Sequence, residues 1–272
     1  MNSYPKLFSS SLNSKMKRWN LKALFLLHLL ILFLFASLFF PPTKALWKIL
    51  DTTLFHLLNS TLEGPLWWQT FWAAANHPWA DWLEDLCILS FFAAYLFTGS
   101  PFVRPRRLAE LLLCAAYSAA VIYFFNRLFI REQLHYYWPS PSAFFENAIH
   151  LNDKIPWISI KDSSLKSFPG DHATTALLFA SFYGYLVRGR LALFAAAYAA
   201  LLCLPRLITG AHWVSDILVG SSSIVLFFLS WLFCSPLFHT LSNLLEKSFI
   251  LLLRLKRKWA RLEFGARDEL RP

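Results

Sequence analysis

Six long apolar runs constrain the fold of this 272-residue chain more than any other feature. A helix needs about 20 mostly apolar residues to cross a bilayer. The runs cover residues 21–40, 82–97, 108–125, 173–187, 191–204 and 213–233. Hydrophobic residues make up 57% of the chain and charged residues 15%, against about 25% charged in average usage, which excludes disorder and disfavours a soluble enzyme. We therefore predict an all-α, polytopic membrane helical bundle with six transmembrane helices.

The weaker runs and the two ends of the chain refine this prediction. Glu84 and Asp85 fall in the first turn of the second run and are expected at an interface. The short fourth and fifth runs are expected to tilt, to start near the headgroups or to end beside a water-filled pocket. The first run exceeds the apolar core of a signal peptide and is expected to stay as an anchor. We expect a basic cytoplasmic tail (1–20), a membrane domain (21–236) and a basic amphipathic cytoplasmic tail (237–272).

The distribution of positive charge predicts which side of the membrane each loop faces. With the N-terminus in the cytoplasm, 18 of the 26 lysines and arginines lie on the cytoplasmic side and eight on the outer side. The positive-inside rule therefore places both termini in the cytoplasm. This arrangement accounts for most of the net charge of +10, so we expect membrane lipids as partners and no nucleic acid.

Three polar clusters adjoin the runs, and each needs an explanation because polar groups in a membrane are costly. They are residues 131–141 after the third run, residues 168–172 before the fourth, and residues 206–216 between the fifth and the sixth. The number of crossings between them places all three on one side of the membrane, and the charge distribution makes this the outer side. Their convergence on one side predicts an active site there.

The residue types in these clusters suit the binding of phosphate. Arg131 and Arg206 are permanent cations that can form paired hydrogen bonds to phosphate oxygens. Pro169 and Gly170 are expected to open a helix, whose first free amides bind anions. The clusters therefore predict an anionic substrate with a phosphate group.

Two histidines, His172 and His212, can hold and release protons near neutral pH. Asp216 follows His212 by four residues, so on a helix its carboxylate would lie one turn away and accept the imidazole N–H. The other nitrogen of His212 would then be free to attack phosphorus, and His172 would protonate the departing oxygen. This set predicts phosphoryl transfer through a phosphohistidine, with no metal or other cofactor.

Plainer interpretations of the same residues stay open. The His-x3-Asp spacing occurs often by chance at helix starts, and Asp171 is expected to be an N-cap whose charge keeps it from phosphate. A metal bound by His172, His212 and Asp216 is disfavoured because the adjacent arginines repel a cation. The four cysteines are expected to be buried and unbridged, and the many tryptophans to form an interfacial belt.

The spacing Arg206-x5-His212-x3-Asp216, preceded by Pro169-x-x-His172, resembles the signature of the type-2 phosphatidic acid phosphatase superfamily. These are six-helix membrane enzymes that act on lipid phosphates and diphosphates without metal. Further matches resemble one branch, the Kdo2-lipid A phosphotransferases or lipid A 1-diphosphate synthases. These matches lie at Leu50-Asp51, Phe55, Leu58-Asn59, Ala75-Asn76, Asp81, Lys161-Asp162, 167–172, Pro205-Arg206, 210–213, 216–217 and 219–221.

The resemblance implies a role for each central residue: His212 as nucleophile, His172 as acid, Asp216 as the carboxylate that orients His212, and Arg206 as phosphate clamp. In the branch, the donor is undecaprenyl diphosphate and the acceptor is the 1-phosphate of lipid A, at the periplasmic face of the bacterial inner membrane. A lipid phosphotransferase is therefore our first hypothesis. Two alternatives stay open, a phosphatase that passes the same phosphate to water and a non-catalytic protein that binds anionic lipid.

Two positions depart from the superfamily pattern. Gly170 replaces a serine, and the branch shares this change. Trp138 replaces the arginine of the usual Lys-x6-Arg-Pro motif, in which Arg131 holds the lysine position. The second change removes a fixed charge and five N–H donors, so another cation is expected to take over, unless the substrate preference has moved. The accessory candidates are Lys161, Lys166 and Asp171.

Overall fold

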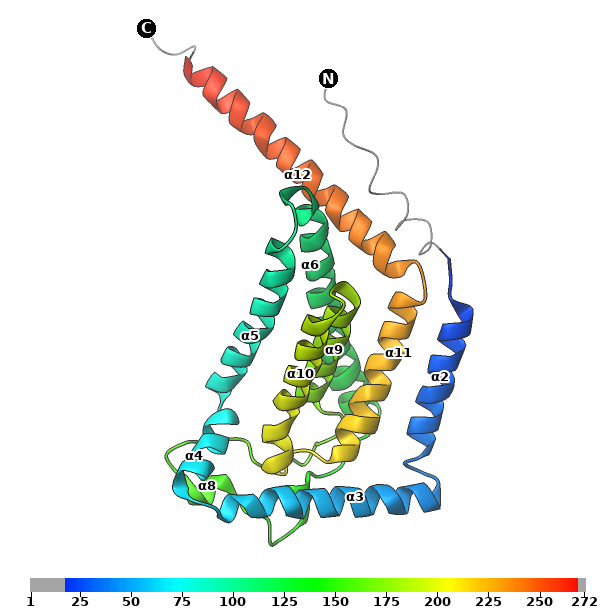
Figure 1. Cartoon of the computed structure of the whole chain (residues 1–272), viewed down its shortest axis with the longest axis vertical. Helices are drawn as coiled ribbons and strands as arrows, with labels where there is room; N and C mark the ends of the chain where they lie inside the picture. Colours follow the sequence, from blue (N-terminus) through cyan, green and yellow to red (C-terminus); the bar gives the residue numbers. More distant parts are fainter. Residues whose placement is uncertain (1–17, 269–272) are drawn as a thin grey trace.

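The computed structural model describes residues 18–268, with side chains up to residue 252. Every regular element in this part of the chain is a helix (Figure 1), which confirms the predicted all-α class. The elements are α2 (Leu21–Ala36), α3 (Pro41–Asn59), η1 (Ser60–Glu63), α4 (Leu66–Ala75), α5 (Pro78–Phe97), η2 (Pro101–Val103), α6 (Arg104–Ala120), η3 (Val121–Gln133), α7 (Pro141–Phe144), α8 (Leu151–Lys154), α9 (Asp171–Leu186), α10 (Arg190–Ile208), η4 (Asp216–Ser221), α11 (Ser222–Phe233) and α12 (Leu237–Asp268).

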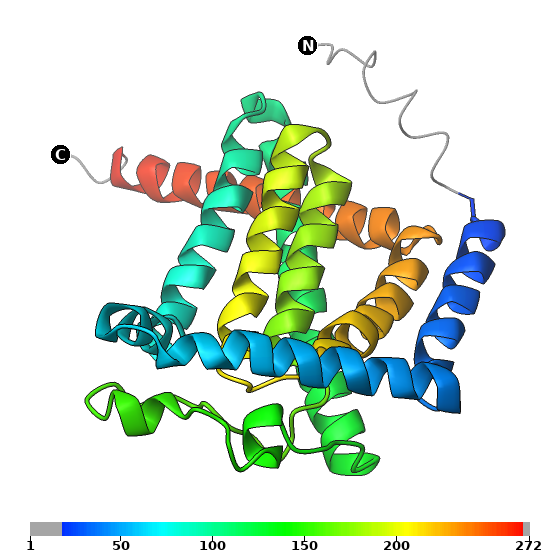
Figure 2. The ribbon, with the colours of Figure 1, turned by 60° about the horizontal axis from the view of Figure 1, so that its bottom comes forward.

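Each of the six predicted runs lies mainly in a helix, and these helices run side by side along the bundle (Figures 1 and 2). Among the described residues, three helical stretches are long and apolar enough to cross a membrane, namely Pro101–Gln133, Arg190–Ile208 and Asp216–Phe233. A fourth results if Leu21–Ala36 and Pro41–Glu63, bent by 75°, form one broken span. Six crossings and two cytoplasmic termini therefore stay predictions.

The remaining candidate helices fall short for physical reasons. Helices α2 and α9 have 16 residues each, which at about 1.5 Å per residue is shorter than a hydrocarbon core of roughly 30 Å. Helix α5 has 20 residues but carries Asp81, Glu84 and Asp85 in its first turns. Charged groups are costly in hydrocarbon, so this end of α5 is expected near the membrane surface.

Two helices lie across opposite ends of the bundle (Figures 1 and 2), α3 at one end and α12 at the other. The chain turns sharply between α2 and α3 because Pro41 and Pro42 open α3, and proline has no N–H with which to continue the preceding helix. The predicted helix in the C-terminal tail is present as α12. The basic side chains of that tail beyond residue 252, and residues 1–17 of the N-terminal tail, lie outside the described residues.

Two apolar clusters hold the bundle together. One joins α6, η3, α9 and α11 around the fully buried Leu178 and Leu232. The other joins α9 to α10 around Tyr183 and Ala195, and Phe91 of α5 packs edge-on against Tyr183 with ring centroids 5.3 Å apart. Since α9 contributes to both clusters, packing fixes the position of its N-terminus relative to α10 and α11.

The long loop between η3 and α9 is packed against the helices at the α3 end. Leu151 and Ile155 are fully buried in a third apolar cluster with η1 and α4. The buried Asn59, the last residue of α3, accepts a hydrogen bond from the Ile149 N–H at 2.8 Å and donates to the carbonyls of Ile149 and Ile208 at 3.2 Å. This loop therefore forms a fixed layer over the bundle end that holds the polar clusters.

Candidate active site

The three polar clusters meet at the bundle end over which α3 lies. The first cluster begins in the last turn of η3, the second leads into α9, and the third runs from the end of α10 to the first residue of η4. All three clusters lie at the same end of the molecule (Figure 2). The geometry therefore brings together residues that are up to 85 positions apart, from Arg131 to Asp216.

His212 lies beside a buried carboxylate. Its Nδ1 is 3.5 Å from Oδ2 of Asp216, whose side chain has no exposed surface. The same Oδ2 accepts hydrogen bonds from the Trp213 N–H at 3.0 Å and from the Ser167 hydroxyl, which itself lies 3.4 Å from Nδ1 of His212. Because Nδ1 faces this carboxylate, Nε2 on the other side of the ring is the nitrogen directed away from it. The 3.5 Å between Nδ1 of His212 and Oδ2 of Asp216 is compatible with a catalytic hydrogen bond, because such bonds often shorten only when substrate binds.

The expectation that His212 and Asp216 share one helix is wrong. His212 lies in the turn before η4, and η4 begins only at Asp216. The turn forms because Gly210 adopts a φ of +72°, a left-handed conformation that favours glycine, and because the Ala211 and His212 N–H groups both donate to the carbonyl of Arg206 at 2.9 and 3.2 Å. The turn, rather than a helical repeat, brings the imidazole to the carboxylate.

Gly170 lies directly against His212. A Cβ built on Gly170 would lie 3.5 Å from both Cε1 and Nδ1 of the imidazole. Gly170 is also the N-cap of α9, and Asp171 is its first helical residue, so the expectation that Asp171 is the N-cap is wrong. The free amides of the first turn of α9 therefore begin next to His212, where an anion is favoured.

His172, in that first turn, faces Arg206 and Asp81. Nη2 of Arg206 lies 2.9 Å from Nε2 of His172 and donates to Oδ1 of Asp81 at 3.0 Å. Nε2 of His172 also lies 3.3 Å from the same Oδ1. An unprotonated Nε2 accepts from Arg206 and a protonated one donates to Asp81, so the two contacts belong to alternative protonation states.

Arg206 is further fixed by Asn76. Its Nη1 donates to Oδ1 of Asn76 at 3.0 Å, and the Asn76 amide donates to the carbonyls of Trp72 and Pro205. Asn76 is only 2% exposed, whereas the Asp81 side chain is 42% exposed. The Arg206 guanidinium therefore has one buried partner, Asn76, and two partners nearer the surface, His172 and Asp81.

The environment of Asp81 favours its ionised form. A hydrogen bond from His172, together with the positive charges of His172 and Arg206, holds the pKa of the Asp81 carboxyl below its usual value of 3.8, although partial burial acts in the opposite direction. Asp81 lies just before the second apolar run. It is therefore an anion at neutral pH, placed where a phosphate oxygen could take its position on Arg206.

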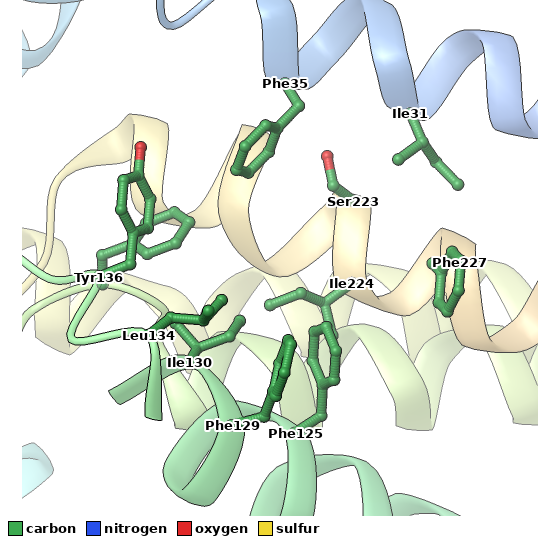
Figure 3. Close-up of a pocket in the computed structure, with 11 residues that line it drawn as sticks. Ile31, Phe35, Phe125, Phe129, Ile130, Leu134, Tyr136, Ser223, Ile224 and Phe227 are labelled. Carbon is green, nitrogen blue, oxygen red and sulfur yellow. The ribbon is translucent and has the colours of Figure 1, made fainter. Parts of the chain in front are cut away.

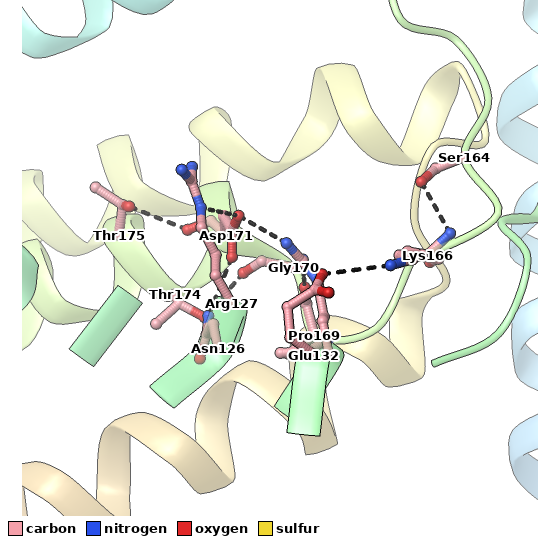
Figure 4. A network of polar contacts seen from close by, with 12 residues as sticks. Asn126, Arg127, Glu132, Ser164, Lys166, Pro169, Gly170, Asp171, Thr174 and Thr175 are labelled. Carbon is pink, nitrogen blue, oxygen red and sulfur yellow. Dashed lines mark hydrogen bonds and ion pairs between the residues drawn. The ribbon is translucent and has the colours of Figure 1, made fainter. Parts of the chain in front are cut away.

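Figure 4 shows a polar network around Asp171, and Arg131 contributes to it. Its Nη1 donates to Oδ2 of Asp171 at 2.9 Å, and its Nη2 donates to the carbonyl of Pro169. Arg127 and Asn126 donate to the same carboxylate at 3.2 and 3.3 Å. Arg131 thus braces the loop that presents Gly170, while its charge is shared with Asp171.

Of the three accessory candidates, the two lysines are exposed. Lys161 is exposed, and Lys166 pairs with Glu132 at 3.4 Å and lies over the ring of Tyr137. Trp138, at the position of the superfamily arginine, packs against Phe168 with ring centroids 4.4 Å apart. Its carbonyl also accepts the Ser167 N–H at 2.8 Å. Trp138 therefore supports the site loop through apolar packing.

Three residues with direct contacts in this site were not assigned a role from the sequence, namely Asn76, Asp81 and Ser167. Asn76 and Asp81 come from the chain between the first and second runs, and Ser167 precedes the second cluster. In the sequence, Asn76, Asp81 and Ser167 were marked only by the resemblance to the lipid A branch, which gave none of them a role. Among the described residues, no group of three or more His, Cys, Asp or Glu side chains is arranged to hold a metal ion.

The chain is similar to one known protein and matches one known family. Over 230 residues the chain is 27% identical to the lipid A 1-diphosphate synthase of Escherichia coli (strain K12), which covers 84% of this chain and 94% of that protein. No solved structure matches the chain. Residues 108–241, which include Arg131, His172, Arg206, His212 and Asp216, match the PAP2 superfamily. The chain therefore carries a PAP2 superfamily domain and is an enzyme of the phosphatase and phosphotransferase class.

Proposed function

We propose that this protein transfers a phosphate from undecaprenyl diphosphate to the 1-phosphate of lipid A, at the periplasmic face of a bacterial inner membrane. The observation that carries the proposal is the placement of His212 against Gly170 at the start of α9, with His172 in the same helical turn. The name of the E. coli relative supports a lipid diphosphate as product and lipid A as acceptor.

The reaction proceeds in two steps through His212. Nε2 attacks the terminal phosphorus of the donor, the bridging P–O bond breaks, and the departing lipid phosphate takes a proton from His172. Asp216 stabilises the charged phosphoimidazole. An oxygen of the acceptor phosphate then attacks phosphorus, the P–N bond breaks, and the acceptor proton returns to His172. Arg206 and the first amides of α9 hold the phosphate oxygens throughout.

The experiment that tests this proposal uses purified protein with undecaprenyl diphosphate labelled in its terminal phosphate. With lipid A present, we expect label in a lipid A diphosphate, and acid-labile label on the protein in a rapid quench. The variant His212→Gln loses the nucleophilic nitrogen, so both signals should fall by at least 10³-fold, the scale of losing an activated nucleophile. The matched control is His135→Gln, an exposed histidine of the first cluster whose ring lies 3.2 Å from the Gln133 carbonyl and has no assigned role.

Each alternative predicts a different distribution of label. Release of inorganic phosphate that is unchanged by lipid A would identify a phosphatase that uses the same intermediate. Absence of product and of protein-bound label from the parent protein would leave only a lipid-binding role. Unchanged transfer by His212→Gln would refute the phosphohistidine.

A further inference from the structure

A cavity of about 490 Å³ lies beside the candidate active site, between α2, η3 and α11 (Figure 3). This volume falls within the range of about 300–1,000 Å³ that is usual for ligand pockets. Its walls are almost entirely apolar and include Phe35 of α2, Phe129 of η3 and Ile224 of α11. Such walls favour a hydrocarbon occupant over a charged or strongly hydrated one.

The position of the cavity points to a lipid as the source of that hydrocarbon. Helix η3 is the end of the stretch Pro101–Gln133, and η4 with α11 forms Asp216–Phe233, both long and apolar enough to cross a membrane. The outer side chains of α2, such as Leu32 and Phe33, are exposed, which suits a helix that faces hydrocarbon. The cavity therefore opens among helices whose surroundings are lipid chains.

The cavity is continuous with the loop that holds the active site. Phe168, two residues before Gly170, forms part of its wall. Gly220 of η4 approaches the Phe168 ring so closely that no Cβ would fit there. Ile130, another wall residue, directly precedes Arg131, which donates to the Pro169 carbonyl. A chain in this cavity would therefore have its polar end close to the phosphate site.

One polar group in the wall has no partner. The hydroxyl of Ser223, whose residue is 5% exposed, has no hydrogen-bond partner among the described residues. The preceding hydroxyls are satisfied, since Ser221 donates to the Gly170 carbonyl and Ser222 to the Ile217 carbonyl. Figure 3 shows the Ser223 hydroxyl on the cavity side of α11. A buried unsatisfied hydroxyl is costly, which favours a ligand that supplies an oxygen acceptor.

We infer that this cavity binds an acyl chain of the phosphate acceptor, with an ester or amide carbonyl of that lipid accepting a hydrogen bond from Ser223. The inference rests on the proposed function. An isoprenoid chain fits the apolar walls but has no oxygen for Ser223. The acylated lipid therefore suits the cavity between α2, η3 and α11 better than the isoprenoid donor does.

The first test fills the cavity and follows both half-reactions. Ile224→Trp places a bulky indole ring in the cavity wall. The control, Leu218→Trp, adds the same ring at an exposed position of η4 outside the cavity. With Ile224→Trp we expect at least a tenfold rise in KM for lipid A, while the acid-labile label that the donor alone leaves on the protein stays within twofold of the parent. Leu218→Trp should match the parent in both. A rise in the donor KM instead, or an unchanged KM for lipid A, would overturn the inference.

The second test does not depend on phosphate transfer, so its failure is distinct from failure of the proposed function. Binding of a radiolabelled diacyl phosphatidic acid and of its dialkyl ether analogue is measured with purified protein in mixed micelles. The parent should prefer the ester lipid by about fivefold, the scale of one hydrogen bond. Ser223→Ala should bind both lipids equally, with an unchanged melting temperature. Equal binding by the parent, or a preference kept by Ser223→Ala, would refute the carbonyl contact.

Discussion

The buried guanidinium of Arg206 is held by three groups, and they are not equivalent. Asn76 is anchored by two backbone carbonyls and stays in place. Asp81 is an anion on a side chain that is 42% exposed, so it can yield its place on Arg206 to a phosphate oxygen. His172, the third partner, would then keep Asp81 as its own partner. We therefore expect Asp81 to compete with substrate for Arg206 and to orient His172.

This dual role predicts that Asp81→Asn lowers both KM and kcat. KM for the donor should fall severalfold because a competing and repelling carboxylate is gone. The kcat should fall by about tenfold, a fraction of the 10²–10⁴ that general acid catalysis typically contributes. Steady-state kinetics on purified protein checks both. A lower kcat with an unchanged or higher KM would indicate a merely structural role.

The matched control is Asp85→Asn, which makes the same charge change one turn along α5 and should leave both constants within twofold.

The pH dependence of stability gives a second check on Asp81. Because the pKa of Asp81 is held below 3.8, the carboxylate stays charged as pH falls from 7 to 5. Any loss of melting temperature caused by Asp81→Asn should therefore persist at pH 5 and disappear only as pH falls through that lowered pKa.

At this scale, the sequence was sufficient for residues whose chemistry fixes their spacing. The four-residue spacing of His212 and Asp216 predicted that the two side chains lie close together, but not the turn at Gly210 that brings them there. Asp81 and Ser167 meet their partners across 91 and 49 positions, and no spacing rule covers such distances. The sequence showed that Trp138 replaces an arginine, but it did not show that the Trp138 ring packs against Phe168.

Among the elements, α3 anchors both the loop and the turn of the site. Asp51 accepts hydrogen bonds from the N–H and the hydroxyl of Ser215 at 2.9 and 2.6 Å, just before η4 begins. One turn further on, the ring of Phe55 fills the space beside Gly210. Asn59 then binds the loop at Ile149. The position of His212 therefore depends on a helix that contributes no atom to the proposed reaction.

Asn59→Ala tests this anchoring. The change removes three hydrogen bonds and leaves the Ile149 and Ile208 carbonyls without this donor. At about 1 kcal/mol per bond, plus the cost of unpaired buried groups, we expect a loss of about 2–4 kcal/mol in stability. Thermal unfolding in detergent measures the loss, and faster proteolysis of loop 134–170 would locate it. The control is Ser60→Ala, whose exposed hydroxyl bonds only within the helix; equal melting temperatures for the two variants would contradict the anchoring role.

The helices themselves were predictable, but their irregularities were not. Apolar runs identified the cores of α2, α5, α6, α9, α10 and α11 because burial in hydrocarbon demands length and low polarity. The π-helical segments η3 and η4 leave no mark on that pattern. Both lie beside the site, where such segments are frequent. The bend before α3 could have been anticipated from Pro41 and Pro42, since both remove a donor.

For the whole molecule, the predicted orientation has a direct test. Leu165, in the loop at the site end, is 75% exposed, and Phe102, at the α5–α6 turn, is 87% exposed. If the site faces outward, a membrane-impermeant thiol reagent should label Leu165→Cys in intact cells and Phe102→Cys only after permeabilisation. The parent, with its own four cysteines, serves as the blank. The reverse labelling pattern would invert the orientation predicted from charge.

The 16 residues of α9 have a consequence for the surrounding membrane. This short helix carries Gly170 and His172 at its head, and it packs against α10, which carries Arg206. If α9 crosses the membrane as predicted, a thicker bilayer must thin locally around it, at a small cost for each ångström of mismatch. Such thinning brings the lipid headgroups closer to Gly170 and His172. The acyl length of the host bilayer thereby becomes a determinant of how the lipid phosphates meet the catalytic groups.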